Sequence, residues 1–282
     1  MIQINKRHLQ RRKIKNNLLI GVATLVTLAG LMLPIWILAT VVERGIGSFN
    51  LALFTQMTPP PEAEGGLLNA ILGSFMMVGE AMLLASPIGI ITGVYLAEYG
   101  KESKLAVTIR FVNDILLSAP SIVIGLFVYM VMVLPMGHFS GYAGVVALAI
   151  LAVPTIVRTT ENMLRLVPQF MREGAFALGS TMRQTILLIT LPAARNGIVT
   201  GILLALARIT GETAPLLFTA LNNQFFSTDM DQPMANLPVV IFQFAMSPYD
   251  NWQSLAWAGA ALITIYVVAI NLLARMVFSR RV

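Results

Sequence analysis

Residues 167–192 read VPQFMREGAFALGSTMRQTILLITLP and lie between two apolar stretches, and this segment decides the fold. Pro168 can occupy the first position of a helix. Apolar or small residues then recur at helical spacing, namely Val167, Phe170/Met171, Gly174 and Ala177/Leu178. Gly179 permits a turn with positive φ, and a second helical run extends from Met182 to Leu191. The segment therefore predicts a helix, a glycine turn and a second helix that ends at Pro192 and leads into the apolar stretch that follows.

A short helix with an apolar face must cover that face. It can lie on a membrane surface, pack on its own bundle, or enter a groove of a partner. The helical pattern alone leaves these three arrangements open.

The fixed positions of this segment resemble the loop E-A-A-x(3)-G-x(9)-I-x-L-P of permease subunits in ABC importers. The matching residues are Glu173, Ala175, Gly179, Ile189, Leu191 and Pro192, and Gly174 replaces the first alanine. The resemblance implies a cytoplasmic coupling loop at 168–192 that docks into a groove on an ATPase subunit. The chain itself has no G-x-x-x-x-G-K-[ST] stretch, so we expect a non-enzymatic subunit that binds no cofactor, with ATP and Mg held by the partner ATPase.

The composition surrounding this loop indicates a membrane protein. Of the 282 residues 57% are hydrophobic and 11% are charged, far from the quarter that soluble domains carry. The net charge of +6 could suggest nucleic acid, but the basic residues flank apolar stretches, and we expect no nucleic-acid partner. There are no cysteines, and the two histidines, His8 and His138, are isolated, so no metal site is expected.

Six stretches are long and apolar enough to predict transmembrane helices. They are Leu18–Val42, Leu68–Ala97, Leu105–Leu134, Tyr142–Val157, Asn196–Leu221 and Leu255–Val277. The first is too long for a signal-peptide core and shows no clear cleavage site, so we expect it to be retained. We divide the chain into a basic arm at 1–17, the first transmembrane helix with an outer loop at 18–67, and a permease domain at 68–282. That domain contains five further helices and a coupling loop at 158–195.

The basic residues predict the orientation. Six lie in the N-terminal arm, three between the second and third stretches, five between the fourth and fifth, and three at the C-terminal end, which makes 17 of 19 on one side. By the positive-inside rule this side is the cytoplasm, and both termini lie there. The other side carries an acidic, proline-rich loop and the apolar segment 238–246, which is too short to cross a membrane and is predicted to be interfacial or re-entrant.

Charged residues inside the predicted fifth helix form the second candidate site. Arg208 and Glu212 are one turn apart and we place them near the midplane of the membrane, where charges are costly. They could form an internal ion pair. Alternatively, Arg208 binds an oxyanion whose O–H donates a hydrogen bond to Glu212, which suits phosphate better than sulfate, because sulfate carries no proton near neutral pH. Thr213 and Glu80 are further pathway candidates, Glu80 lining the pathway or pairing with Arg208. Arg110 and Asp114 are predicted to form a structural pair.

The run RITGETAPLLFTA, residues 208–220, is similar to the PstA family of phosphate importer permeases, as are the segments that start at Leu237 and Trp252. The resemblance implies an all-α integral membrane fold of the MetI-like type I ABC importer class, in a bacterial cytoplasmic membrane. It also implies three kinds of protein partner: a second, PstC-like permease, an ABC ATPase dimer of the PstB type and an external PstS-like phosphate-binding protein. The alternatives are a permease for molybdate or sulfate, a secondary transporter and a membrane-embedded enzyme.

Overall fold

The computed structural model describes residues 6–100 and 103–279, with side chains described for 10–100 and 103–272. The described chain is helical throughout. Its elements are α1 (Lys6–Ile46), α2 (Ala52–Thr55), α3 (Leu68–Val94), η1 (Tyr95–Tyr99), α4 (Lys104–Ser118), α5 (Ser121–Val128), η2 (Tyr129–Val133), α6 (Leu134–Met136), α7 (Gly141–Leu166), α8 (Gln169–Ala177), α9 (Met182–Thr185), η3 (Ile186–Thr190), α10 (Leu191–Thr210), α11 (Ala214–Leu217), α12 (Leu237–Ala245) and α13 (Asp250–Ser279). The three η elements are π-helical turns that continue the helices beside them.

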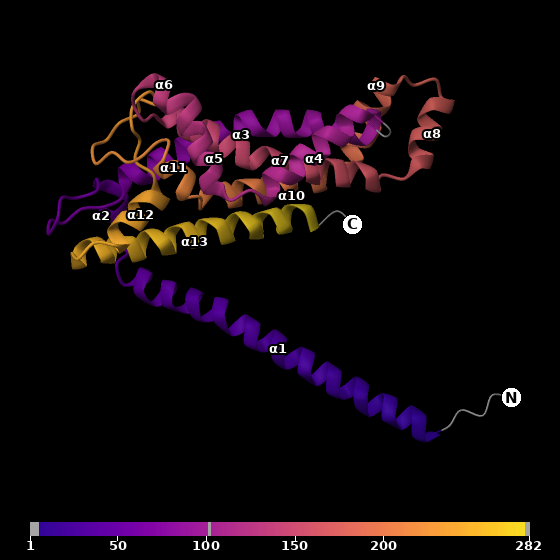
Figure 1. The fold of residues 1–282 in the computed structure, drawn as a ribbon, viewed down its shortest axis with the longest axis horizontal. Coiled ribbons are helices and arrows are strands. Elements are labelled where there is room, and N and C mark those ends of the chain that lie inside the picture. The colour runs from indigo at the N-terminus through magenta and orange to yellow at the C-terminus, as the bar shows by residue number, and fades with distance from the viewer. Residues whose placement is uncertain (1–5, 101–102, 280–282) are drawn as a thin grey trace.

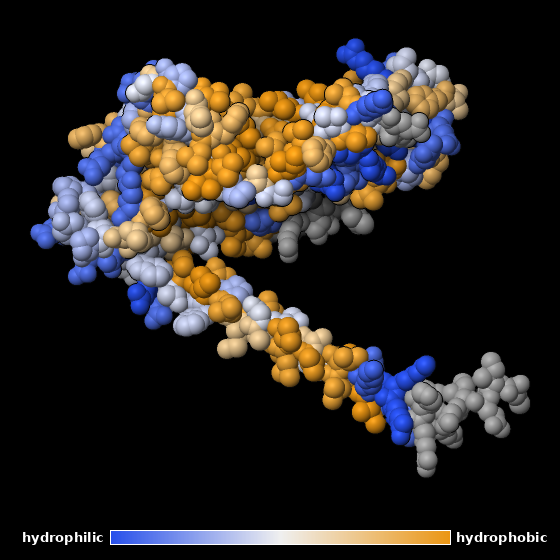
Figure 2. Space-filling model, in the orientation of Figure 1, coloured by the Kyte–Doolittle hydropathy of each residue, from blue (hydrophilic) through white to orange (hydrophobic). Residues whose placement is uncertain are grey.

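The described residues contain five helices that are long and apolar enough to cross a membrane, and a sixth crossing if the bent pair α4–α5 counts as one span. Four of the long helices, α3, α7, α10 and α13, run side by side (Figure 1), while α1 leans away from them. Apolar residues cover the middle of the bundle, and hydrophilic residues gather at its two ends (Figure 2). The fold is therefore that of a multi-pass membrane protein.

The predicted third span, Leu105–Leu134, is wrong as a single straight helix. The chain bends by 106° between α4 and α5. Pro120 has no N–H and disfavours helical geometry in the residue before it, and Ala119 is accordingly extended with ψ 136°. The two halves nevertheless take the chain from the end of the bundle near α8 towards the end near α2 (Figure 1).

The predicted limits of three other spans are too narrow or misplaced. The fourth helix, α7, continues to Leu166 instead of ending at Val157, so the first nine residues assigned to the coupling loop are helical. The fifth begins at Met182 and ends at Thr210, because Gly211 stops the helix before Leu221. The first, α1, includes the basic arm from Lys6 onward. Lys101, Arg280 and Arg281, which support the predicted orientation, lie outside the described residues, as does the side chain of Arg275.

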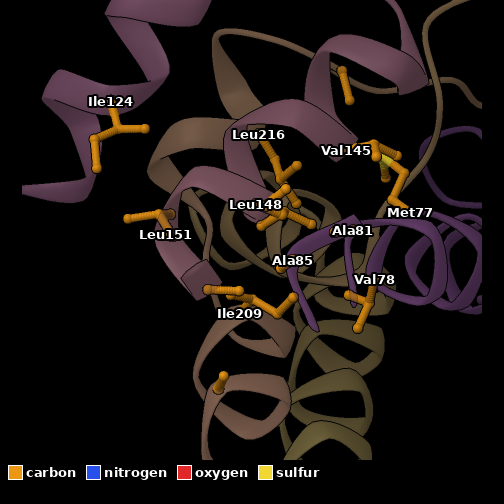
Figure 3. Close-up of a cluster of buried hydrophobic side chains, with 14 of the residues drawn as sticks. Met77, Val78, Ala81, Ala85, Ile124, Val145, Leu148, Leu151, Ile209 and Leu216 are labelled. Carbon is orange, nitrogen blue, oxygen red and sulfur yellow. The ribbon is translucent and has the colours of Figure 1, made fainter. Parts of the chain in front are cut away.

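The core forms where α3, α7 and α10 pack together. Gly93 of α3 lies against Thr160 of α7, and a Cβ at Gly93 would come within 2.6 Å of the Thr160 Cβ. Gly201 of α10 packs equally closely on Thr159. Small residues of this kind let membrane helices approach without bulky side chains between them. The largest apolar cluster, which includes Ala81, Leu148 and Ile209, fills the space between the three helices (Figure 3).

Candidate functional site

The predicted coupling helix is present as α8, at the end of the bundle opposite α2 and α12 (Figure 1). Pro168 precedes it with φ −59°. Gly179 ends it with φ +83°, so the predicted helix start and glycine turn are confirmed. The Ser180 N–H donates to the Ala175 carbonyl (3.0 Å) and the Gly179 N–H to the Phe176 carbonyl (2.9 Å), a pairing that satisfies the last carbonyls of the helix.

The two faces of α8 differ in what they contact. Met171, Arg172 and Ala175 face the bundle, and Met171 packs against the cluster formed with Leu164 and Val167. The opposite face is exposed and contains Phe170, Glu173, Gly174, Ala177 and Leu178. Phe170 is 71% exposed and Leu178 is 89% exposed. The chain thus presents an apolar helix face that its own bundle does not cover.

The prediction that the second helix of the loop ends at Pro192 is wrong. A capping box between Thr181 and Gln184 starts α9. The helix then widens into the π-turn η3, in which the Leu191 N–H donates to the Ile186 carbonyl, and continues as α10 through Pro192. Because the wider turn rearranges the hydrogen bonds before the proline, the missing N–H of Pro192 does not stop the helix. Of the remaining motif residues, Ile189 and Leu191 are half-buried and Pro192 is exposed.

Arg208 and Glu212 lie at the break that ends α10. Ile209 belongs to the same apolar cluster as Ala81, which lies midway along α3, so the pair lies at the depth of the middle of that helix. The Arg208 Nε is 3.8 Å from the Glu212 Oε1, which is an ion pair but too long for a hydrogen bond. In the described part of the chain the Arg208 guanidinium donates no hydrogen bond, and its side chain is 35% exposed against 16% for Glu212. The guanidinium donors of Arg208 are thus not used by the described residues, and the Glu212 carboxylate lies close enough to offset its positive charge.

The other two pathway candidates lie on neighbouring elements. Thr213 follows Glu212, and its carbonyl accepts from the Leu217 N–H at 3.1 Å, which starts α11. Glu80 is half-buried on α3 beside Gly79. The carboxylate within 4 Å of Arg208 among the described residues is that of Glu212, so the predicted alternative in which Glu80 pairs with Arg208 is not what the structure shows.

The predicted pair Arg110–Asp114 is also wrong. The Arg110 Nε donates to the Glu161 Oε1 at 2.8 Å, and Asp114 instead pairs with Arg158 at 3.5 Å. Glu161 is buried and also accepts from Arg165, so it offers Arg110 a more strongly desolvated partner than exposed Asp114.

An ion pair that the sequence did not suggest joins Arg172 of α8 to Glu98 of η1. The two nitrogens Nη2 and Nε lie 2.7 Å and 3.2 Å from the two carboxylate oxygens. In the sequence, Glu98 stands out as an acidic residue at the end of an otherwise apolar run, two residues before Gly100. The partner of that residue, 74 positions away, had no signal of its own.

Two cavities among the described residues are well formed, and neither is lined by Arg208 or Glu212. An apolar cavity of ≈ 290 Å³ lies between α3, α10, α12 and α13, where Ser74, Thr210 and Tyr266 supply its polar atoms. A polar cavity of ≈ 320 Å³ lies among the loops near α2 and the start of α13. Because Arg208 is partly exposed and lines neither of these cavities, an enclosed site around it requires a second protein surface.

Comparison with known proteins identifies relatives along nearly the whole chain. The family model described as "Binding-protein-dependent transport system inner membrane component" matches residues 85–281. The phosphate transport system permease protein PstA of Yersinia pestis is 58% identical over 271 residues, which cover 96% of this chain and 92% of the relative. PstA of Haemophilus influenzae is 55% identical, with 96% of each chain covered.

Solved structures share the fold. A chain of the inward-facing MetNI methionine ABC transporter superposes with a TM-score of 0.65 at 21% identity, which covers 76% of this chain and 95% of that one. A chain of an amino acid ABC transporter superposes with a TM-score of 0.53 at 19% identity. At these identities the likeness concerns the fold alone.

Proposed function

The chain belongs to the family of binding-protein-dependent transport system inner membrane components, and from this premise we propose that it is the PstA-type permease subunit of an ATP-driven phosphate importer. It forms one half of the translocation pathway and does not itself hydrolyse ATP. Its near-full-length relatives are phosphate transport permeases, which favours phosphate over molybdate or sulfate as the substrate.

The observation that carries the proposal is the uncovered face of α8. Phe170 and Leu178 expose apolar surface beside the acidic Glu173 at one end of the bundle, and such a face needs a groove on a partner. We assign this groove to an ABC ATPase dimer of the PstB type, which holds the ATP and Mg. A PstC-like second permease completes the pathway around Arg208, and an external PstS-like protein delivers phosphate to the outer loops.

The membrane orientation follows from the charges. Arg165 lies in the last turn of α7, Arg172 lies on α8, Arg183 lies on α9, and Arg110 of α4 binds Glu161 of α7. These arginines mark the end of the bundle that carries α8 (Figure 1), so this end faces the cytoplasm of a bacterial cell with the protein in its cytoplasmic (inner) membrane. Both termini are then cytoplasmic. The binding and hydrolysis of ATP move α8, and the helices alternate between outward-open and inward-open arrangements.

At the centre of the membrane we assign substrate contact to Arg208, with Glu212 and Thr213 beside it and Glu80 on the facing helix. A guanidinium donates two parallel hydrogen bonds to a tetrahedral oxyanion. Phosphate keeps at least one proton near neutral pH, and the Glu212 carboxylate accepts a hydrogen bond from that O–H. The free donors of Arg208 support this assignment, since a purely structural pair would use them.

The test measures phosphate uptake by cells that depend on this permease. Arg208→Gln is expected to reduce uptake by about 100-fold or more, because each lost charge-assisted hydrogen bond contributes about 1.5–3 kcal/mol. Arg195→Gln, at the exposed cytoplasmic end of the same helix, is the matched control and should transport normally. Co-purification of the ATPase is followed in parallel. Full phosphate uptake by an assembled Arg208→Gln transporter would rule out the assigned contact.

A further inference from the structure

Arg172 connects the coupling helix to the membrane bundle through four hydrogen bonds. Its guanidinium binds both carboxylate oxygens of Glu98, at 2.7 Å and 3.2 Å. It also donates to the Val167 carbonyl (2.6 Å) and the Leu164 carbonyl (2.8 Å), where α7 ends. One side chain of α8 thus holds the ends of two transmembrane helices, α3 through η1 and α7 through its last carbonyls.

The burial of this pair separates it from the exposed ion pair Asp114–Arg158 of the same end. The Glu98 side chain is 2% exposed and that of Arg172 is 15% exposed. Asp114 and Arg158, by contrast, are both about half exposed and touch only at 3.5 Å. A buried bidentate pair holds its geometry far more strictly than an exposed one, because neither charge can turn to water instead.

Glu98 lies on a π-turn that is held from a second side. The Leu96 carbonyl of η1 accepts from Arg110 of α4 at 2.9 Å, and Arg110 also binds Glu161 of α7. The cytoplasmic end of α3 is therefore joined by arginines to α4, α7 and α8. Without the contact to Glu98, α8 would be free to pivot between the extended residues Val167 and Pro168 on one side and Gly179 on the other.

We propose that Arg172 and Glu98 are positioning residues that transmit the movement of α8 to α3. This inference rests on the proposed function, in which α8 is moved by an ATPase. The path continues along α3, because Gly93 packs against α7 and Ala81 packs in one cluster with Ile209, the neighbour of Arg208. A displacement of α8 thus reaches the depth of Arg208 through a rigid helix as well as through the connecting loops.

The first test measures whether α8 and α3 move as one body. The chain has no cysteines, so spin labels can be placed at Phe176→Cys, which lies on α8 outside the face assigned to the ATPase, and at Ile91→Cys on α3; both positions are exposed. The assembled transporter is expected to give one narrow distance distribution. Glu98→Gln should broaden it, while Lys104→Gln, which removes an exposed cytoplasmic charge, should leave it narrow. An unchanged distribution in Glu98→Gln would overturn the link.

The second test separates transmission from stability. The double variant Glu98→Leu, Arg172→Met removes both buried charges, so the transporter should assemble as the wild type does. In reconstituted vesicles we expect about tenfold less phosphate taken up per ATP hydrolysed than with the wild type, within the usual range of coupling between distant sites. Wild-type coupling in this double variant would refute the inference. A wild-type transporter that takes up no phosphate would instead refute the proposed function, and the distance measurement would still decide the link.

Discussion

Gly174 is the residue at which α8 departs from the importer-permease loop that it resembles. It lies on the exposed face of α8, and a Cβ built at this position meets no other atom within 4 Å. Gly174→Ala is therefore expected to stabilise α8, since glycine in a helix interior costs about 0.8–1.0 kcal/mol relative to alanine. Slower hydrogen exchange of the α8 amides, with unchanged phosphate uptake, would be the observed result. If uptake falls, the ATPase groove must approach the backbone at Gly174 too closely for a methyl group.

For single residues, the sequence predicts ion pairs whose members lie one helical turn apart. It misses ion pairs whose members are distant in sequence and are brought together only by the fold. Arg208 and Glu212 are found because i,i+4 spacing places them on one face. The same rule fails for Arg110 and Asp114, because Glu161, 51 residues away, is a more buried partner. Nothing in the sequence links Glu98 to Arg172, because their contact depends on how the end of α7 turns into α8.

Proline acts differently from one helix to another in this chain. Pro34, Pro87 and Pro154 lie inside α1, α3 and α7, and Pro192 lies at the junction of η3 and α10, yet all four helices continue. Pro120 alone, among the described prolines that interrupt an apolar span, separates two helices bent by 106°. Membrane helices tolerate proline where neighbouring groups satisfy the carbonyl, one turn earlier, that the missing N–H leaves free. Such help comes from other helices, so the sequence could not predict which proline breaks a span.

A change in the turn that ends α8 should impair coupling to the ATPase without affecting insertion of the protein into the membrane. Gly179 has φ +83°, a conformation that a β-branched residue strongly resists. Gly179→Val is expected to leave the protein inserted and assembled but to reduce phosphate uptake by at least about tenfold, because the Ser180 N–H would no longer reach the Ala175 carbonyl. Gly174→Ala, on the same helix with unrestricted backbone, is the matched control. Normal uptake by Gly179→Val would mean that the orientation of α8 does not depend on this turn.

The two ends of the whole molecule are stabilised by different chemistry. At the end that carries α2, Asn69 of α3 donates to the Thr58 hydroxyl and the Asn223 carbonyl, both at 2.9 Å, so neutral amides hold the loops to the bundle. At the end that carries α8, buried carboxylates and arginines do so, as Glu98 and Glu161 illustrate. Amide contacts carry no net charge, whereas the arginines at the α8 end are the charges on which the proposed orientation rests.

The orientation of the whole chain gives the last prediction. The loop near α2 and the helix α8 lie at opposite ends of the bundle (Figure 1). If the bent pair α4–α5 crosses the membrane, these two ends lie on opposite sides of the membrane. In intact cells a membrane-impermeant maleimide should modify Glu64→Cys in the loop near α2, while Phe176→Cys, on α8 but outside the face assigned to the ATPase, should react only after permeabilisation. Gln10→Cys, at the basic start of α1, should behave as Phe176→Cys does. If α4–α5 were a re-entrant loop, only five helices would cross, and Glu64→Cys and Phe176→Cys would react from the same side. That outcome would place α8 away from any cytoplasmic ATPase and would overturn both the topology and the coupling assigned to it.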